Sequence, residues 1–206
     1  MIEQGFNPEN LKTFLIAGCY SRSSIEAVIF LINQINPGKD VTLIVTDINQ
    51  EAFELINKYP IETPPKIKLV MFRGDLTKIA LKSGSVDYVR MDYLQNFVPE
   101  ENKLELFKEM SRVTSENGMV VNMVENIPKA KNIIQKVIRK LFRGSGSRVD
   151  HSATRPYGFN RFLPSEEFLN QVANHSGFVK KHIASQKRVF FDNTVSSLCV
   201  FTKKKK

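Results

Sequence analysis

The chain has 206 residues, of which 42% are hydrophobic and 25% are charged, and these values are typical of one globular domain. No window approaches the roughly eighteen uninterrupted apolar residues of a membrane span, and no basic segment leads into an apolar stretch near Met1. We therefore expect neither a membrane helix nor a signal peptide. The two cysteines, Cys19 and Cys199, indicate no disulfide framework and favour a reducing, cytoplasmic location.

Charge is distributed unevenly along the chain, whose formal net charge is +9. Residues 1–125 carry 13 Lys and Arg against 17 Asp and Glu, whereas residues 126–206 carry 17 against 4. A basic field of this kind attracts anions. The C-terminal part is therefore expected to favour an anionic substrate, nucleic acid or an acidic membrane surface. The lysine run at 203–206 is expected to be a solvated chain end.

Apolar runs of strand length alternate with stretches of helical spacing in the first part of the chain. Gly18 closes the first strand, and Pro37 with Gly38 ends the first helix. Ser23 and Glu26 fit a capping box, which predicts where that helix begins. In chain order the pattern predicts strand 13–17, a helix from 23 to 36, strand 41–46, helix 50–59, strand 67–72, a helical turn at 76–81, strand 86–91, helix 100–113 and, after a turn at 116–118, strand 119–124.

The end of the chain completes the predicted fold. A helix from 164 to about 176 is followed by strands 178–191 and 195–202, which are joined at Asp192 and Asn193. Short crossovers between the earlier strands imply a parallel sheet. We therefore predict an α/β fold: a mostly parallel seven-stranded sheet with helices on both faces and a C-terminal antiparallel hairpin, in a single domain of residues 1–206.

A basic helical insertion is predicted at about 126–162. Its helix, 126–144, follows the i, i+3, i+4 apolar pattern, and residues 126–149 hold seven Lys and Arg and no acid. Three interpretations of this helix are open. Its apolar face packs on the domain while its basic face is solvated; it forms a lid whose basic residues contact an anionic substrate; or it lies on a membrane surface. In the loop that follows, His151 is either a general base or a solvated surface group. The candidate substrate residues of this loop are His151, Arg155, Tyr157 and Arg161.

The turn after the first strand lacks a dinucleotide fingerprint. G-x-G-x-x-G placed on Gly18 requires glycine at positions that hold Tyr20 and Ser23. A tyrosine at the second position blocks the close backbone approach of a pyrophosphate, so the turn argues against NAD or FAD. The helix start after the turn still offers free N–H groups and a positive dipole end, which suit a carboxylate.

Carboxylates follow three of the predicted strands. Asp47 can accept both hydroxyls of a ribose, or it can cap the next helix. Asp75 can accept from an adenine amino group, with Leu76 against the ring, or it can cap the turn that follows. Asp92 and Tyr93 end the fourth strand, on the edge where open α/β sheets bind ligands.

The order of these features resembles the class I S-adenosylmethionine-dependent methyltransferases. Asp47 matches the family's ribose-binding acid, and the final hairpin matches its reversed seventh strand. The other matching segments are LIAGC at 15–19, GDL at 74–76, VDYV at 86–89, the helix around 105–113, Gly118, and FLPSEEF at 162–168 with Gly177 and Phe178.

This resemblance implies S-adenosylmethionine as the cofactor and methyl transfer to a small or medium-sized, anionic acceptor. RNA stays open as a partner, although aromatic residues are sparse in the basic stretch. Three histidines and two distant cysteines show no metal-ligand spacing. The implied cofactor-binding residues are Ala17, Gly18, Cys19, Tyr20, Ser23, Asp47, Ile48, Gly74, Asp75, Leu76, Met91, Asp92 and Tyr93.

The turn also departs from the family pattern, because Tyr20 and Arg22 replace its later glycines. This departure leaves open a catalytically inactive, methyltransferase-like binding or scaffold subunit. A dinucleotide-dependent reductase is a third hypothesis, against which Tyr20 counts. No residue of the chain is assigned as the catalytic base.

Overall fold

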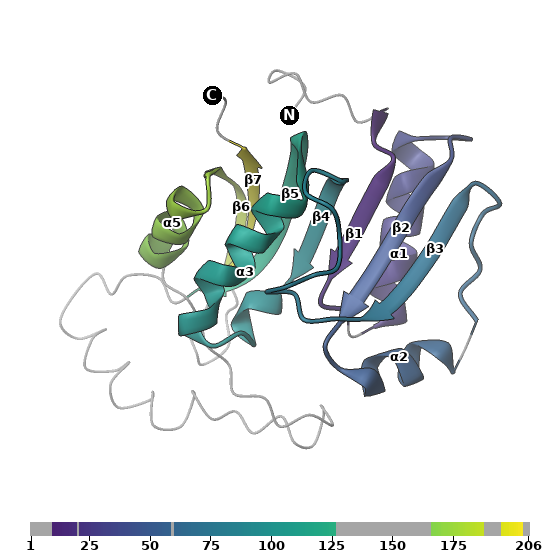
Figure 1. Ribbon diagram of the computed structural model, residues 1–206, viewed down its shortest axis with the longest axis horizontal. Coiled ribbons are helices and arrows are strands. Elements are labelled where there is room, and N and C mark those ends of the chain that lie inside the picture. The colour runs from purple at the N-terminus through teal and green to yellow at the C-terminus, as the bar shows by residue number, and fades with distance from the viewer. Residues whose placement is uncertain (1–9, 20, 59, 127–165, 188–194, 204–206) are drawn as a thin grey trace.

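The computed structural model describes residues 10–19, 21–58, 60–126, 166–187 and 195–203 (Figure 1). The predicted basic insertion at 126–162 lies almost wholly outside these residues. The described elements are β1 (Thr13–Ala17), α1 (Arg22–Ile35), β2 (Val41–Asp47), α2 (Gln50–Asn57), β3 (Ile67–Arg73), β4 (Val86–Asp92), the 3₁₀ helix η3 (Leu94–Asn96), α3 (Glu100–Val113), β5 (Thr114–Asn126), α5 (Glu166–His175), β6 (Phe178–Lys187) and β7 (Val195–Lys203). None of the helices among these residues is long and apolar enough to cross a membrane.

The strands form one seven-stranded sheet in the order β3-β2-β1-β4-β5-β7-β6. The neighbouring pairs among β1 to β5 are parallel, and β7 runs antiparallel to both β5 and β6. The predicted fold class is confirmed. The strand order reverses between β1 and β4, because β2 and β3 extend the sheet on one side and the later strands extend it on the other. Such a switch point is where open α/β sheets bind ligands.

Two hydrophobic cores lie on opposite faces of the sheet. On one face, α1 and α2 bury Ile25, Val28 and Phe53 against the sheet. On the other face, α3 and α5 bury Phe107 and Leu169. Figure 1 shows α1 and α3 on opposite sides of the strands. Alternate residues of the strands serve the two cores, as the period of two requires.

Helix α1 begins earlier than its predicted capping box. The N-cap is Ser21, whose Oγ accepts a hydrogen bond from the backbone N–H of Ser24 at 3.3 Å. Ser23 therefore lies in the first turn of the helix, and its prediction as the cap is wrong. Glu26 accepts from Arg22 Nε at 2.6 Å, an i, i+4 pair on the exposed face.

Strand β5 also differs from its prediction, because it begins directly after α3 and absorbs the predicted turn at 116–118. Val86 of β4 pairs with Thr114, but Tyr88 pairs with Met119, so the residues between them form a bulge. The backbone at Gly118 is tight: a Cβ there would lie 2.7 Å from Thr114 Cγ2. The Glu-Asn-Gly signal thus marks a bulge inside one strand.

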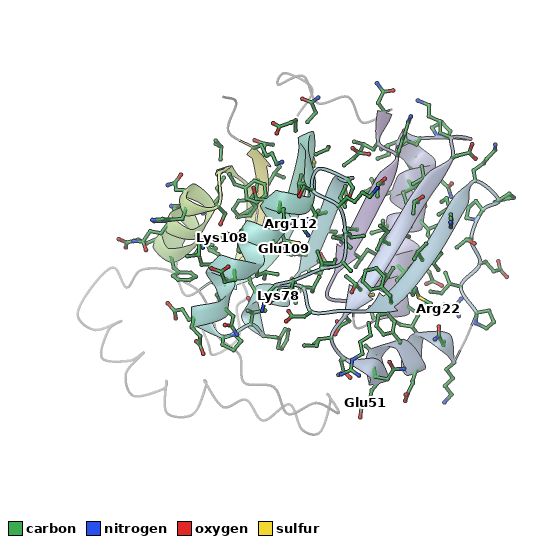
Figure 2. The ribbon with its side chains drawn as sticks, viewed as in Figure 1. Arg22, Glu51, Lys78, Lys108, Glu109 and Arg112 are labelled. Carbon is green, nitrogen blue, oxygen red and sulfur yellow. The ribbon has the colours of Figure 1, made fainter. Side chains whose placement is uncertain are left out.

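The segment 76–81 forms turns rather than the predicted helical turn. Arg112 of α3 holds it by donating from Nη2 to the Ile79 carbonyl at 3.0 Å and from Nη1 to the Leu81 carbonyl at 2.8 Å. Both oxygens of Glu109 accept from the same guanidinium, at 2.7 Å each. Figure 2 shows Arg112 and Glu109 together on α3. Two carbonyls of the segment are therefore paired with a side chain, and that of Ile79 also accepts from the backbone N–H of Leu81 at 2.8 Å.

Candidate functional site

The carboxyl ends of β1, β2 and β4 meet at the switch point, and each end holds a residue predicted to bind the cofactor. Gly18 directly follows β1, Asp47 is the last residue of β2, and Asp92 is the last residue of β4. The charges of Asp47 and Asp92 raise the pKa of the Cys19 thiol in the first turn, and the charge of Arg90 lowers it. The structure thus brings together the predicted residues of three separate strands.

The turn after β1 requires glycine at its first position. Gly18 has a φ of +76°, and a Cβ built on it would lie 2.7 Å from Leu94 Cδ1. Its backbone N–H donates to the Thr46 carbonyl at 2.9 Å, which ties the turn to β2. The positive φ disfavours any residue with a Cβ here, and a Cβ would also force the Leu94 side chain to move.

Cys19 is a buried thiol, with 1% of its surface exposed. Its Sγ donates to the Ser21 carbonyl at 3.4 Å. Burial is the main cause that raises the pKa of this thiol, to about 11. Because the thiolate is the nucleophilic form, the raised pKa and the burial of Cys19 disfavour a nucleophilic role near neutral pH.

Asp47 is not the N-cap of α2. That cap is Asn49, whose Oδ1 accepts from the backbone N–H of Glu51 at 3.0 Å. Asp47 Oδ1 accepts from the backbone N–H of Asn49 at 2.8 Å. Burial raises the pKa of Asp47, while hydrogen bonds from the backbone of Asn49, Cys19 and Ile48 oppose that rise. The half-buried carboxylate therefore faces the turns after both β1 and β2, and the capping alternative is wrong.

Asp75 organises the turn in which it lies. Its Oδ1 accepts from both the backbone N–H and the Oγ1 of Thr77, at 2.8 Å each, and these bonds lower the pKa of the exposed carboxyl. The preceding Gly74 donates to the Asp47 carbonyl at 2.9 Å. A Cβ on Gly74 would lie 3.1 Å from Thr46 Oγ1, so the ends of β2 and β3 meet closely there. Asp75 therefore stabilises its own turn through Thr77, and its contact with an adenine stays a prediction.

At the end of β4, Asp92 is 9% exposed, and its Oδ2 accepts from Arg90 Nε at 2.7 Å. Its Oδ1 is buried and has no hydrogen-bond partner among the described residues. Tyr93 has a φ of 57°, the left-handed region, which costs a residue with a Cβ about 1–2 kcal/mol. Its backbone N–H donates to the Met123 carbonyl at 2.8 Å. Strain at the end of a strand, beside an orphaned carboxylate oxygen, is typical of a functional site.

Sequence reasoning missed three buried amides next to these residues. Gln95 and Asn96 of η3 and Asn122 of β5 have no exposed surface. Neither the oxygen nor the nitrogen of their side chains has a hydrogen-bond partner in the part of the chain that the structure describes. Asn122 gave a readable signal, because an amide interrupts the otherwise apolar run 119–124. Gln95 and Asn96 gave none, since the segment after Tyr93 had no predicted element.

The remaining predicted residues fall into three groups. Ala17, Leu76 and Met91 are buried in the core under α3 and α5. Ser23 is exposed on α1, and Ile48 is exposed beside Asp47, with 58% of its surface accessible. Tyr20, His151, Arg155, Tyr157 and Arg161 lie outside the described residues. No group of three or more potential metal-ligating side chains lies together within the described ranges.

Comparisons with known proteins agree with this geometry. A family model described as "Methyltransferase domain" matches residues 31–122. No curated protein matches the chain.

Solved structures match over almost the whole chain. A SAM-dependent methyltransferase of Methanosarcina mazei is 16% identical with a TM-score of 0.68, over 98% of this chain and 96% of that one. The YcgJ protein of Bacillus subtilis is 9% identical with a TM-score of 0.66, over 100% and 98%. A magnesium protoporphyrin IX methyltransferase of Synechocystis, solved with bound SAH, is 13% identical with a TM-score of 0.58, over 98% and 78%. The family match over residues 31–122 and these structures agree with the resemblance: the chain has the class I, Rossmann-like fold of the S-adenosylmethionine-dependent methyltransferases.

Proposed function

We propose that the protein binds S-adenosylmethionine at the carboxyl ends of β1, β2 and β4 and transfers its methyl group to an acceptor. The observation that carries this proposal is that Asn49 and Asp47 have separate roles at the end of β2. Asn49 caps α2, so Asp47 is left to face the turn after β1, where a ribose would offer two hydroxyl donors. A carboxylate in that place is the ribose-binding acid of nucleotide sites in α/β sheets.

The other polar groups at this edge fit the rest of the cofactor. Asp92 Oδ1 is a buried acceptor with no partner among the described residues, and it suits the amino group of a methionine moiety. The lack of room for a Cβ at Gly18 and Gly74 keeps the backbone of both turns close to β2 and η3. Ile48, exposed beside Asp47, offers an apolar surface to an adenine ring.

The structure also bears on the missing glycines. Because Ser21 is the N-cap, Ser23 lies within α1, and Gly18 has a positive φ at the start of the turn. The geometry that the first glycine must supply is therefore kept. This supports cofactor binding over the hypothesis of an inactive scaffold.

The bound cofactor supplies a sulfonium whose methyl carbon is open to in-line attack. The contribution of the chain is to orient the two molecules and to shield them from water. The acceptor would lie beyond β4 and β5, next to Tyr93. The basic charge of residues 126–206 supports an anionic acceptor, and the same charge suits a nucleic acid or an acidic membrane surface.

Calorimetry with S-adenosylmethionine, SAH and NAD tests the proposal. We expect binding of the first two in the micromolar range and none of NAD. The proposed function would be refuted if neither S-adenosylmethionine nor SAH bound detectably at millimolar concentration. Release of SAH on incubation with a cell's small-molecule extract, followed by mass spectrometry, then separates turnover from binding alone.

A further inference from the structure

We propose that Gln95, Asn96 and Asn122 form an amide site that recognises a neutral polar group of the methyl acceptor. The group bears both hydrogen-bond donors and acceptors, as a carboxamide, a urea or the edge of a nucleobase does. This inference rests on the proposed function, because it names what the acceptor presents to the protein.

The amides lie between the cofactor turn and β5. Leu94 of η3 stands over Gly18, so the short helix covers the end of β1. The hydrogen bond from Tyr93 N–H to the Met123 carbonyl, 2.8 Å long, joins the entrance of η3 to β5. Asn122 is the residue before Met123 and pairs in register with Met91 of β4. The three amides thus belong to η3 and β5, two elements that meet beside the end of β4.

Burial without partners distinguishes these amides from ordinary polar residues. All three have no exposed surface, and all six of their polar atoms have no partner among the described residues. Asn122 is in register with Met91 and Cys199, both of which belong to the core. An apolar side chain would suit such a position better, because a buried amide without a partner costs stability. A ligand that pairs with the amides would remove that cost.

The chemistry of the amides selects a neutral group. Each side chain presents a carbonyl acceptor and an NH₂ donor side by side. An anion uses the donors alone and leaves three carbonyl oxygens directed at its charge. A neutral group with both kinds of atom satisfies both. Arg90, a cation of the adjoining strand β4, is already paired with Asp92 at 2.7 Å. Any anionic part of the acceptor would therefore lie elsewhere, toward the basic C-terminal part of the chain.

Two molecules of the same shape test this selection: benzamide is neutral with donors and an acceptor, and benzoate is anionic. The side-chain NH₂ signals of ¹⁵N-labelled protein are followed during titration, with and without SAH. Asn122→Leu and Gln95→Met assign the signals by their loss. Asn33→Leu, on the exposed surface of α1, is the matched control.

We expect benzamide to shift the Gln95 and Asn122 signals and to bind at least tenfold more tightly than benzoate. Asn122→Leu should lose at least tenfold in benzamide affinity, keep its SAH affinity within twofold and melt no lower than the wild type. Asn33→Leu should change none of these values. The melting temperature tests the premise directly. If the buried amide has no hydrogen-bond partner in the free protein, replacing it with an apolar side chain removes an unfavourable term and should not lower the melting temperature.

Two results would overturn the inference. One is benzoate binding as tightly as benzamide, or benzamide affinity unchanged in Asn122→Leu. The other is no shift with wild-type protein, which would mean that the amides pair within the protein or with structural water. If Asn122→Leu does not fold, Gln95→Met and the wild-type titration still decide. A lack of SAH binding would refute the proposed function separately, since the titration without SAH still reports on the amides.

Discussion

Asp47 and Asn49, two residues apart, carry out separate tasks at the end of β2. Asp47 Oδ1 accepts from the backbone N–H of Asn49 at 2.8 Å, and Asn49 Oδ1 accepts from the backbone N–H of Glu51 at 3.0 Å. The helix cap therefore does not need the carboxylate. Because the tasks are separate, a substitution can remove the carboxylate of Asp47, which is predicted to bind the ribose, without removing the helix cap at Asn49, and the reverse is also possible.

Asp47→Asn should weaken S-adenosylmethionine binding by about 1–3 kcal/mol, because it removes charge-assisted hydrogen bonds to the ribose. Asn49→Ala is the control, and it should cost about 1 kcal/mol of folding stability with little change in cofactor affinity. Calorimetry and urea denaturation measure the two quantities. Equal losses of affinity in both variants would show that Asp47 acts only through the local fold.

Gly18→Ala should destabilise the fold by about 2–4 kcal/mol, because the new Cβ meets both a positive φ and Leu94. Gly38 is a matched control: its φ is +72°, close to the +76° of Gly18, but no atom lies within 4 Å of the position of a Cβ. Gly38→Ala should therefore cost only about 1–2 kcal/mol. Denaturant titrations of both variants measure the difference, which isolates the contact with Leu94. Equal costs would mean that η3 shifts freely over the turn.

The fold was largely predictable because the first four strands, β1 to β4, are apolar runs closed by glycine or aspartate, as at Gly18 and Asp92. Helix α3 was predicted with the bounds that the structure gives it, since its apolar spacing continues without a break to Val113. The bulge in β5 was not, because the Glu-Asn-Gly signal is local and the pairing with β4 that overrides it is not. Likewise, local spacing alone could not decide between Ser21 and Ser23 as the cap.

Arg112→Lys should lower stability by about 1–2 kcal/mol, because a lysine cannot reproduce the fork that bonds Glu109 and the carbonyls of Ile79 and Leu81 at once. Lys108→Ala is the comparison: Lys108 forms an exposed pair with Glu105 at 2.8 Å, and such pairs contribute about 0.2–1 kcal/mol. Thermal melting of both variants measures the contrast. An unchanged melting temperature in Arg112→Lys, which keeps the positive charge, would show that charge alone, and not the carbonyl contacts, holds segment 76–81.

The buried thiol of Cys19 predicts a loss of stability in alkali. Its pKa rises from 9.0 to about 11 on folding, so the folded state retains the proton that the unfolded state releases. The stabilisation is complete below pH 9 and is lost as the pH rises through 11. Relative to pH 8, the contribution at pH 10 should be lower by about 1–1.5 kcal/mol.

Cys19→Ala should remove this part of the pH dependence, whatever its effect on stability at pH 8. Urea denaturation of wild type and variant at pH 8 and pH 10 measures it. The free-energy gap between the two proteins should shift in favour of the variant at the higher pH. A gap that stays constant would show that the thiol is not buried in solution.

The candidate site was predictable in part: its carboxylates could be placed from the sequence, whereas its buried amides could not. Asp47 and Asp92 stand at strand ends, where one-dimensional spacing is enough to place them at a common edge. Gln95 and Asn122 belong to η3 and β5, two elements that are joined by the hydrogen bond from Tyr93 N–H to the Met123 carbonyl, which is a tertiary contact. A sequence pattern shows neither that contact nor the absence of partners that marks these side chains.

The last strand of the described chain, β7, lies inside the sheet, between β5 and β6. Among the described strands, β6 pairs only with β7, so it cannot join the sheet by backbone hydrogen bonds until residues 195–203 have been synthesised. A nascent chain on the ribosome therefore carries β5 with an open edge, and open edges are prone to aggregation. Closure of this half of the sheet therefore requires residues 195–203, and a chain that stops before residue 195 lacks the strand that pairs with β5 on this side.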